Sequence, residues 1–204
     1  MVDIKSDLDA NQTLLLIMSS VEYNDVLVDV VKQLSGNICY VTTNKTFDSL
    51  KEVFEKSKVD VKNVVFIDAI SKTMKKVPDQ GESVYYVSSP GALTELSLVI
   101  GKFLRHEFDY LIFDSITNLL VYQKPQMAAK FMSSLINKIK KTKTKTVFYG
   151  IEGGDNSSII EHTGTAVDKV IKSDGKVGVE KKVVKGVGKK EVKKKIIKKV
   201  EKEV

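Results

Sequence analysis

The amino-acid sequence predicts an α/β fold in three layers, with a mainly parallel central sheet between two layers of helices. Short apolar runs alternate with longer segments in which apolar residues recur every three or four positions, which is the spacing of amphipathic helices. The short runs are apolar throughout, as is typical of strands buried on both faces. Repeated strand–helix–strand order with such strands favours a parallel sheet covered on both sides.

Each element follows from its local pattern. Buried strands are expected at residues 13–18, 37–42, 63–68, 110–114, 146–149 and 167–171, and residues 84–87 form either a short strand or an extended connection. Amphipathic helices are expected at residues 24–34, 47–54, 90–103 and 127–140. The polar residues 71–82 hold Pro78 and Gly81 and predict an exposed loop, as does the segment 153–158.

The loops that follow the strands are the expected functional region. In parallel sheets, ligands bind outside the carboxyl ends of the strands. Residues 19–25, 43–45, Asp68 and 114–118 each follow a predicted strand. We therefore expect these segments to meet at one rim of the sheet.

The charge of the chain is concentrated at its C-terminus. The 204 residues carry a net charge of +7. Residues 172–204 hold 13 Lys against 5 acidic residues, whereas the rest holds 20 basic and 21 acidic residues. We interpret residues 1–188 as one domain and residues 189–204 as a Lys-rich helical extension. Two Lys–Val runs, 176–180 and 182–185, predict a terminal β-hairpin before it.

Several classes of protein are excluded by composition. The single cysteine, Cys39, excludes a disulfide framework and a cysteine metal cluster. No apolar run reaches the ~18 residues of a membrane span, and the first residues, MVDIKSDLDANQ, are too polar for a signal peptide. We expect a cytoplasmic protein.

Residues 110–120, YLIFDSITNLL, resemble the Walker B strand of RecA-superfamily ATPases, above all the KaiC-like and RadA-like proteins of archaea. Residues 39–50 are similar to the KaiC-type strand that leads into its catalytic glutamates, and residues 88–98 resemble the helix before Walker B. The resemblance covers residues 12–188. It implies a RecA/KaiC-like fold of the P-loop ATPase superfamily, a family whose ligands are ATP and Mg²⁺, and an archaeal source.

The phosphate-binding motif of that family is degenerate in this chain. A P-loop, GxxxxGK[ST], should follow the first strand, because its backbone N–H groups and its Lys hold the phosphates. The best overlay places Ser19 and Asn24 at the two glycines, Asp25 at the Lys and Val26 at the Ser/Thr, with Ser20 inside the loop. A carboxylate in place of an ammonium repels a triphosphate. We expect that this loop does not hold ATP in the usual way.

Two further family positions have lost their chemistry. The catalytic glutamate pair falls on Asn44 and Lys45, neither of which is a general base for water. The Lys-x-Arg of KaiC-like proteins, which reaches the nucleotide of a neighbouring subunit, falls on Lys185 and Val187.

Asp114, followed by Ser115, keeps the Walker B position. One interpretation is a vestigial Mg²⁺ ligand. The other, which we favour, is that Asp-Ser caps the following helix. No catalytic residue, cofactor or metal is expected.

The Lys-rich extension carries one apolar stripe, at Val192, Ile196, Ile197, Val200 and Val204. Three interpretations of the extension stay open. It packs on its own domain or on another copy, it extends into solvent, or it contacts an anionic partner. A membrane is disfavoured because the stripe lacks Trp, Phe and Leu. The lysines that would contact nucleic acid are Lys185, Lys189, Lys190, Lys193, Lys194, Lys195, Lys198 and Lys199.

The function expected from these losses is non-catalytic. The chain would be a pseudo-ATPase that acts as a regulatory or scaffold protein, with another copy or an active RecA/KaiC-like relative as its protein partner. Two alternatives stay open. One is atypical nucleotide binding with Mg²⁺ at Asp114, and the other is an accessory role on nucleic acid through the basic tail.

Overall fold

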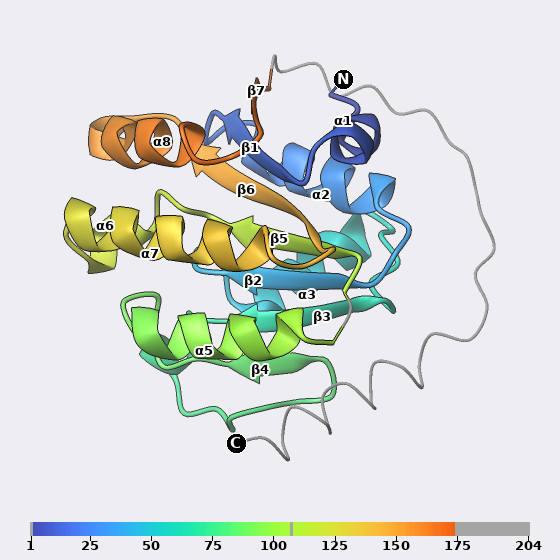
Figure 1. Cartoon of the computed structure of the whole chain (residues 1–204). Coiled ribbons are helices and arrows are strands. Elements are labelled where there is room, and N and C mark those ends of the chain that lie inside the picture. Colours follow the sequence, from blue (N-terminus) through green and yellow to red (C-terminus); the bar gives the residue numbers. More distant parts are fainter. Residues whose placement is uncertain (1, 107, 174–204) are drawn as a thin grey trace.

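The computed structural model describes residues 2–106 and 108–173, which form one sheet and its covering helices (Figure 1). The predicted hairpin at 176–185 and the extension at 189–204 lie outside the described residues. The sheet has seven strands in the order β4-β3-β2-β5-β6-β1-β7, and every neighbouring pair is parallel. The strands are β1 (Thr13–Met18), β2 (Ile38–Thr42), β3 (Val64–Asp68), β4 (Val84–Tyr86), β5 (Tyr110–Asp114), β6 (Lys145–Ile151) and β7 (Lys169–Lys172).

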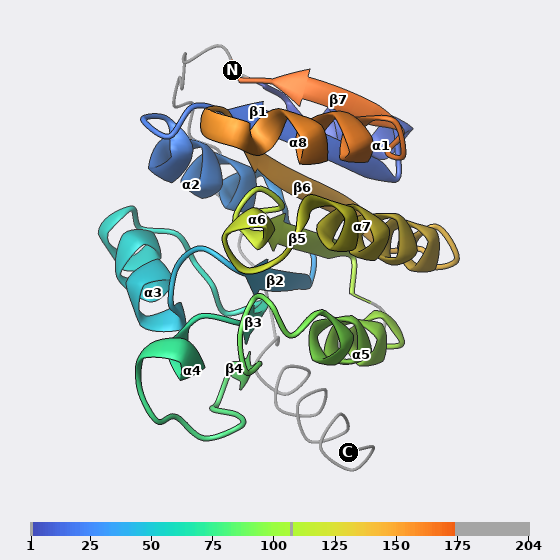
Figure 2. The ribbon, with the colours of Figure 1, turned by 90° about the vertical axis from the view of Figure 1, so that its left-hand side faces the viewer.

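Helices cover both faces of the sheet, which confirms the predicted three-layer fold (Figures 1 and 2). One layer contains α1 (Ile4–Ala10), α2 (Tyr23–Gln33) and α3 (Phe47–Lys56); the other contains α5 (Leu93–Leu104), α7 (Pro125–Ile139) and α8 (Ser157–Gly164). Short helical segments, α4 (Ser71–Met74), α6 (Leu119–Tyr122) and a 3₁₀ turn at Gly154–Asn156, lie in the connections.

The strands divide the interior into two cores because successive side chains point to opposite faces. In β1, Leu14, Leu16 and Met18 pack with the α1–α3 layer. Leu15 and Ile17 pack with the α5, α7 and α8 layer. All six residues of β1 are buried, so the continuous apolar run in the sequence corresponds to a strand covered on both sides.

Two connections differ from the sequence-based expectation. The expected loop at 71–82 begins with α4, because the buried Asp68 carboxylate accepts hydrogen bonds from the N–H groups of Ile70 and Ser71 (2.7 and 2.8 Å) and so starts a turn. The helix α8 begins at Ser157, inside the expected loop at 153–158, and Ile159 is the apolar residue that it buries. A helix with so few buried positions has little apolar periodicity to detect.

Within residues 2–106 and 108–173, no helix combines the length and the apolar character that crossing a membrane requires.

Candidate functional site

The predicted rim forms at the carboxyl edge of the sheet, the edge that faces the viewer in Figure 2. Residues 19–22 connect β1 to α2, residues 43–46 connect β2 to α3, and Asp114 ends β5. In the sheet, β6 lies between β1 and β5, whereas β2 is the direct neighbour of β5. Thr42 at the end of β2 therefore lies beside Asp114 in register.

Asp114 is the buried charged group at the centre of this rim. One carboxylate oxygen, Oδ2, accepts hydrogen bonds from the hydroxyls of Tyr23 (2.5 Å) and Tyr40 (2.8 Å). Tyr23 is the first residue of α2, directly after the loop in the P-loop position, and Tyr40 is in the middle of β2. The other oxygen, Oδ1, is buried without a hydrogen-bond partner among the described residues.

Burial controls the acid–base properties of this group. Removal of the Asp114 carboxylate from water raises its pKa from 3.8 to about 6, and the two tyrosine hydroxyls oppose that rise by bonding the charged form. Burial, followed by the nearby Asp114 charge, raises the pKa values of Tyr23, Tyr40 and Tyr149 above their usual range. The three tyrosines therefore stay neutral, and Tyr23 and Tyr40 act as hydrogen-bond donors to Asp114.

The three tyrosines surround Asp114 in the candidate site, and the sequence analysis missed them. Tyr40 and Tyr149 lie in apolar runs, so the hydrophobic pattern counts them as core positions, whereas Tyr23 lies in the polar segment 19–25 that was expected to be a loop. The signal that indicates them is chemical: a buried tyrosine hydroxyl needs a polar partner, and Asp114 is such a partner for Tyr23 and Tyr40. The hydroxyl of Tyr149 in β6 is buried and has no partner in the described part of the chain.

The capping interpretation of Asp114 and Ser115 is wrong. The following helix, α6, has Asn118 at its N-cap and no side-chain cap hydrogen bond. Asp114 instead bonds the two tyrosines, which lie on other elements. The buried Ser115 connects β5 to the residue after β2, because its backbone N–H donates to the hydroxyl of Thr43 (3.0 Å).

In the loop at the P-loop position, a carboxylate of the loop itself accepts hydrogen bonds from the start of the loop. Glu22 Oε2 accepts hydrogen bonds from the backbone N–H of Ser19 (3.1 Å) and from its hydroxyl (2.5 Å). The other oxygen of Glu22 accepts from the hydroxyl of Ser173 after β7 (3.2 Å). An N–H group of this loop thus already faces a negative charge supplied by the chain.

The remaining predicted positions of the loop lie apart from Asp114. The side chains of Ser20, Asn24 and Asp25 are exposed. Val26 is buried, at 6% exposure, and packs in the α1–α3 core. Asp25 falls in the first turn of α2, where a carboxylate interacts favourably with the helix dipole.

The structure brings Asn44 and Lys45 to the same cluster. The Lys45 ammonium lies over the ring of Tyr23, 5.5 Å from its centroid, and the Asn44 side chain opposes the rise of the Tyr23 pKa, which places it near that hydroxyl. The Thr42 hydroxyl holds this turn, because it accepts from the N–H of Lys45 (3.1 Å) and donates to its carbonyl (2.6 Å). Four predicted or newly found residues therefore meet: Tyr23, Asn44, Lys45 and Asp114.

Other candidate groups do not form a second centre. Cys39 is buried in β2, and burial raises the pKa of its thiol. The His162 ring on α8 lies 2.8 Å from the hydroxyl of Ser133 on α7, at an exposed position. Among the residues that the structure describes, no group of three or more His, Cys, Asp or Glu side chains is arranged to hold a metal ion. The predicted Lys contacts at 185–199 lie outside the described residues.

Comparison with solved structures supports the fold. The chain is similar to the crystal structure of the KaiC-like protein PH0186 from the hyperthermophilic archaeon Pyrococcus horikoshii OT3, with 12% identity, a TM-score of 0.51, and coverage of 79% of this chain and 70% of that one. It is also similar to a prototypical ATPase from the type III secretion system of pathogenic bacteria, with 14% identity, a TM-score of 0.51 and coverage of 79% of this chain. The match spans half the length of that ATPase.

These likenesses show that the described residues have the RecA-like α/β fold that the Walker B resemblance implied. No curated protein sequence matches the chain. A family model described as "Family of unknown function (DUF7090)" matches residues 4–182. The chain therefore belongs to the DUF7090 family.

Proposed function

We propose that this chain is a pseudo-ATPase, a RecA-like domain that works without nucleotide chemistry, and that it acts as a regulatory or scaffold protein through protein–protein contacts. The observation that carries the proposal is the state of Asp114. Its carboxylate is fully buried, and its Oδ2 is already bonded by Tyr23 and Tyr40.

The residues at this rim do not fit a Mg²⁺–triphosphate group. Mg²⁺ keeps several water molecules when it binds protein carboxylates, and the Asp114 side chain is buried among ring and strand atoms. In the adjoining loop, Glu22 accepts the hydrogen bond of the Ser19 N–H, a group of the kind that holds phosphate in a P-loop. Residues 19–26 contain two carboxylates and no lysine, so the local charge repels phosphate.

The hydrolytic step lacks a base at the family position. Attack of water on a phosphoryl group needs a residue that orients or deprotonates that water. Asn44 has an amide side chain, which is not a base, and Lys45 holds its charge over the ring of Tyr23. A protonated ammonium does not accept a proton.

Calorimetric titration of the full chain with ATP and ADP in the presence of Mg²⁺ tests the proposal. We expect no saturable heat of binding, because no group at residues 19–26 compensates the phosphate charge. Saturable binding tighter than about 10 μM that Asp114→Ala abolishes would contradict it. Asp60→Ala, which removes an exposed carboxylate that pairs with Lys62 away from the rim, is the matched control.

A further inference from the structure

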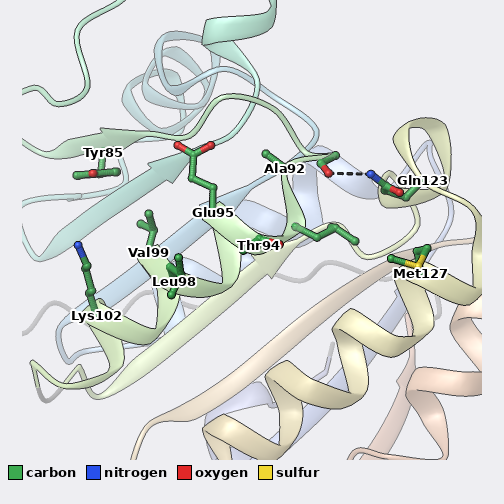
Figure 3. A pocket seen from close by; sticks show the side chains of 11 residues that line it. Tyr85, Ala92, Thr94, Glu95, Leu98, Val99, Lys102, Gln123 and Met127 are labelled. Carbon is green, nitrogen blue, oxygen red and sulfur yellow. Dashed lines mark hydrogen bonds between the residues drawn. The ribbon is translucent and has the colours of Figure 1, made fainter. Parts of the chain in front are cut away.

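A groove in two parts that share lining residues runs along α5, starting from the end of the helix that is nearest the rim. Its first part, of ≈ 730 Å³, lies between α5, Tyr85 of β4, Gln123 after α6, and Met127 in the first turn of α7 (Figure 3). Its second part, of ≈ 330 Å³, lies between the C-terminal half of α5 and the end of α7. Leu98 and Lys102 line both parts. We call this feature the α5 groove.

Two large apolar side chains in the mixed lining of the α5 groove are exposed. Leu98 is 61% exposed and Met127 is 51% exposed, although both are large apolar side chains. Gly101 widens the second part, since a Cβ added there would meet no atom within 4 Å. Single exposed apolar residues are common on protein surfaces, but several that share one groove indicate an interaction site.

The groove continues onto a further apolar surface at α6. Tyr122 is 40% exposed and lies against Gly91, a lining residue, because a Cβ on Gly91 would stand 3.2 Å from that of Tyr122. Val121 beside it is 74% exposed. The amide of Gln123 donates to the carbonyl of Gly91 (2.8 Å) and so holds the end of α6 against the start of α5 (Figure 3).

The charges of the groove are mainly positive. Among the described residues, Lys102, Arg105 and Lys138 line it, against one carboxylate, that of Glu95. Glu95 accepts a hydrogen bond from the backbone N–H of Ser88 (3.2 Å), so it serves its own loop. Lys138 donates to the neutral hydroxyl of Ser97 (2.7 Å). Within the described ranges, neither Lys102 nor Lys138 forms an ion pair with a carboxylate.

Charge decides among the occupants that such a groove accepts. The chain's own C-terminal segment, with 13 Lys from residue 172 onward, would bring like charge to Lys102 and Lys138. A second copy docked groove to groove by a two-fold axis would bring the net positive charge of the groove against that of its partner. A segment with one apolar face and carboxylates beside it satisfies both the apolar lining and the lysines.

We propose that the α5 groove docks an acidic amphipathic helix of a partner protein. The 12 residues of α5 span about 18 Å, which matches three to four turns of a helix laid along it. The apolar face covers Leu98 and Met127, and carboxylates face Lys102 and Lys138. This inference rests on the proposed function, because both require that the chain acts through contacts with other proteins. It adds the surface that makes the contact and the kind of partner that binds there.

A designed peptide of about 15 residues tests this docking. It carries Leu at helical a and d spacing, Glu at the other positions and one Trp as a reporter, because the full chain contains no tryptophan. One comparison peptide has the same composition with the Leu positions scattered, and another has Lys in place of Glu. Trp fluorescence is followed while the full-length chain is added.

We expect saturable binding of the Glu/Leu peptide, and binding at least about tenfold weaker after Leu98→Asp or Lys102→Glu. Met74→Asp changes an exposed apolar residue on α4, and Lys32→Glu changes the net charge equally on the opposite face. We expect both controls to bind within about twofold of the unchanged chain. The Lys32→Glu control separates docking in the groove from general attraction to the positive net charge of the chain, and a peptide held by the basic tail would bind the groove variants as tightly as the unchanged chain.

The docking proposal is overturned by three results: no saturable binding, equal binding of the Lys/Leu or scattered peptide, or loss of affinity in the controls as large as in the groove variants. Far-UV circular dichroism of each variant shows that the fold is retained. A negative peptide result would not change the interpretation of the nucleotide titration. Nucleotide binding at Asp114 would likewise not change the interpretation of the peptide result, so the two proposals can be rejected independently.

Discussion

Asp114 accepts hydrogen bonds from two buried tyrosine hydroxyls, at 2.5 and 2.8 Å, and it is fully buried in the folded chain. A carboxylate in such a place is costly to ionise, and the hydroxyls compensate only part of that cost. The sequence motif identified Asp114 as a site residue. Its partners could not be identified in that way, because the 91 and 74 positions that separate Asp114 from Tyr23 and Tyr40 leave no local pattern.

Asp114 predicts a specific dependence of stability on pH. Its pKa in the folded chain is about 6, above the ordinary 3.8, so the folded state holds the proton more tightly. The free energy of unfolding therefore decreases as pH rises from about 4 to about 6 and is level above that. Asp114→Asn has no such carboxyl group, so we expect its free energy of unfolding to lack this decrease. Between about pH 4 and about pH 6, its stability relative to the unchanged chain should therefore rise by on the order of 2–3 kcal/mol.

Urea unfolding of both proteins at a series of pH values measures the difference. Asp29, whose pKa is also raised by burial, is present in both chains and cancels in the comparison. A stability difference that stays constant from pH 4 to pH 7 would contradict the assigned burial of the Asp114 charge.

At the level of elements, the long and strongly patterned segments were predicted closely and the short ones were not. The strand expected at 110–114 is β5 with the same bounds, and the helix expected at 127–140 is α7 at Pro125–Ile139. The helices α1, α4 and α6 have 7, 4 and 4 residues, fewer than a window in which helical periodicity is visible. Their formation depends on contacts that the local sequence does not show.

Asp68 connects α3 and the short helix α4 to β3. Its buried carboxylate accepts hydrogen bonds from the N–H of Phe47 at the start of α3 (2.7 Å), and from the N–H and hydroxyl of Ser71 at the start of α4 (2.8 and 2.6 Å). The sequence placed Asp68 at the rim, and the structure shows that its bonds there go to the chain itself.

We expect Asp68→Asn to lower the free energy of unfolding by about 2–4 kcal/mol. The amide keeps one acceptor oxygen, and its NH₂ group would face the donors that the second carboxylate oxygen now satisfies. Asp48→Asn, which removes an exposed charge paired with Lys75, is the matched control and should change stability by less than about 1 kcal/mol. A loss in Asp68→Asn no larger than in this control, measured by urea unfolding, would argue against the connecting role.

At the scale of the whole molecule, the fold class and the rim were predictable and the order of the strands was not. Continuous apolar runs such as 13–18 indicate a buried parallel sheet whichever strands are neighbours. The position of β6 between β1 and β5 depends on which crossover helices pack together, and no single segment records it. The site is therefore predicted at the level of its rim, whereas the tyrosine cluster needs the three-dimensional neighbours of Asp114.

The central claim is that the RecA-like rim holds its own side chains in place of nucleotide. A crystal structure of the full chain grown with Mg²⁺ and a non-hydrolysable ATP analogue tests it most directly. The account predicts that the Tyr23 hydroxyl stays on Asp114 and that Glu22 keeps the N–H of Ser19, with no phosphate at residues 19–26. Phosphates seated against residues 19–26, with Tyr23 displaced from Asp114, would contradict it.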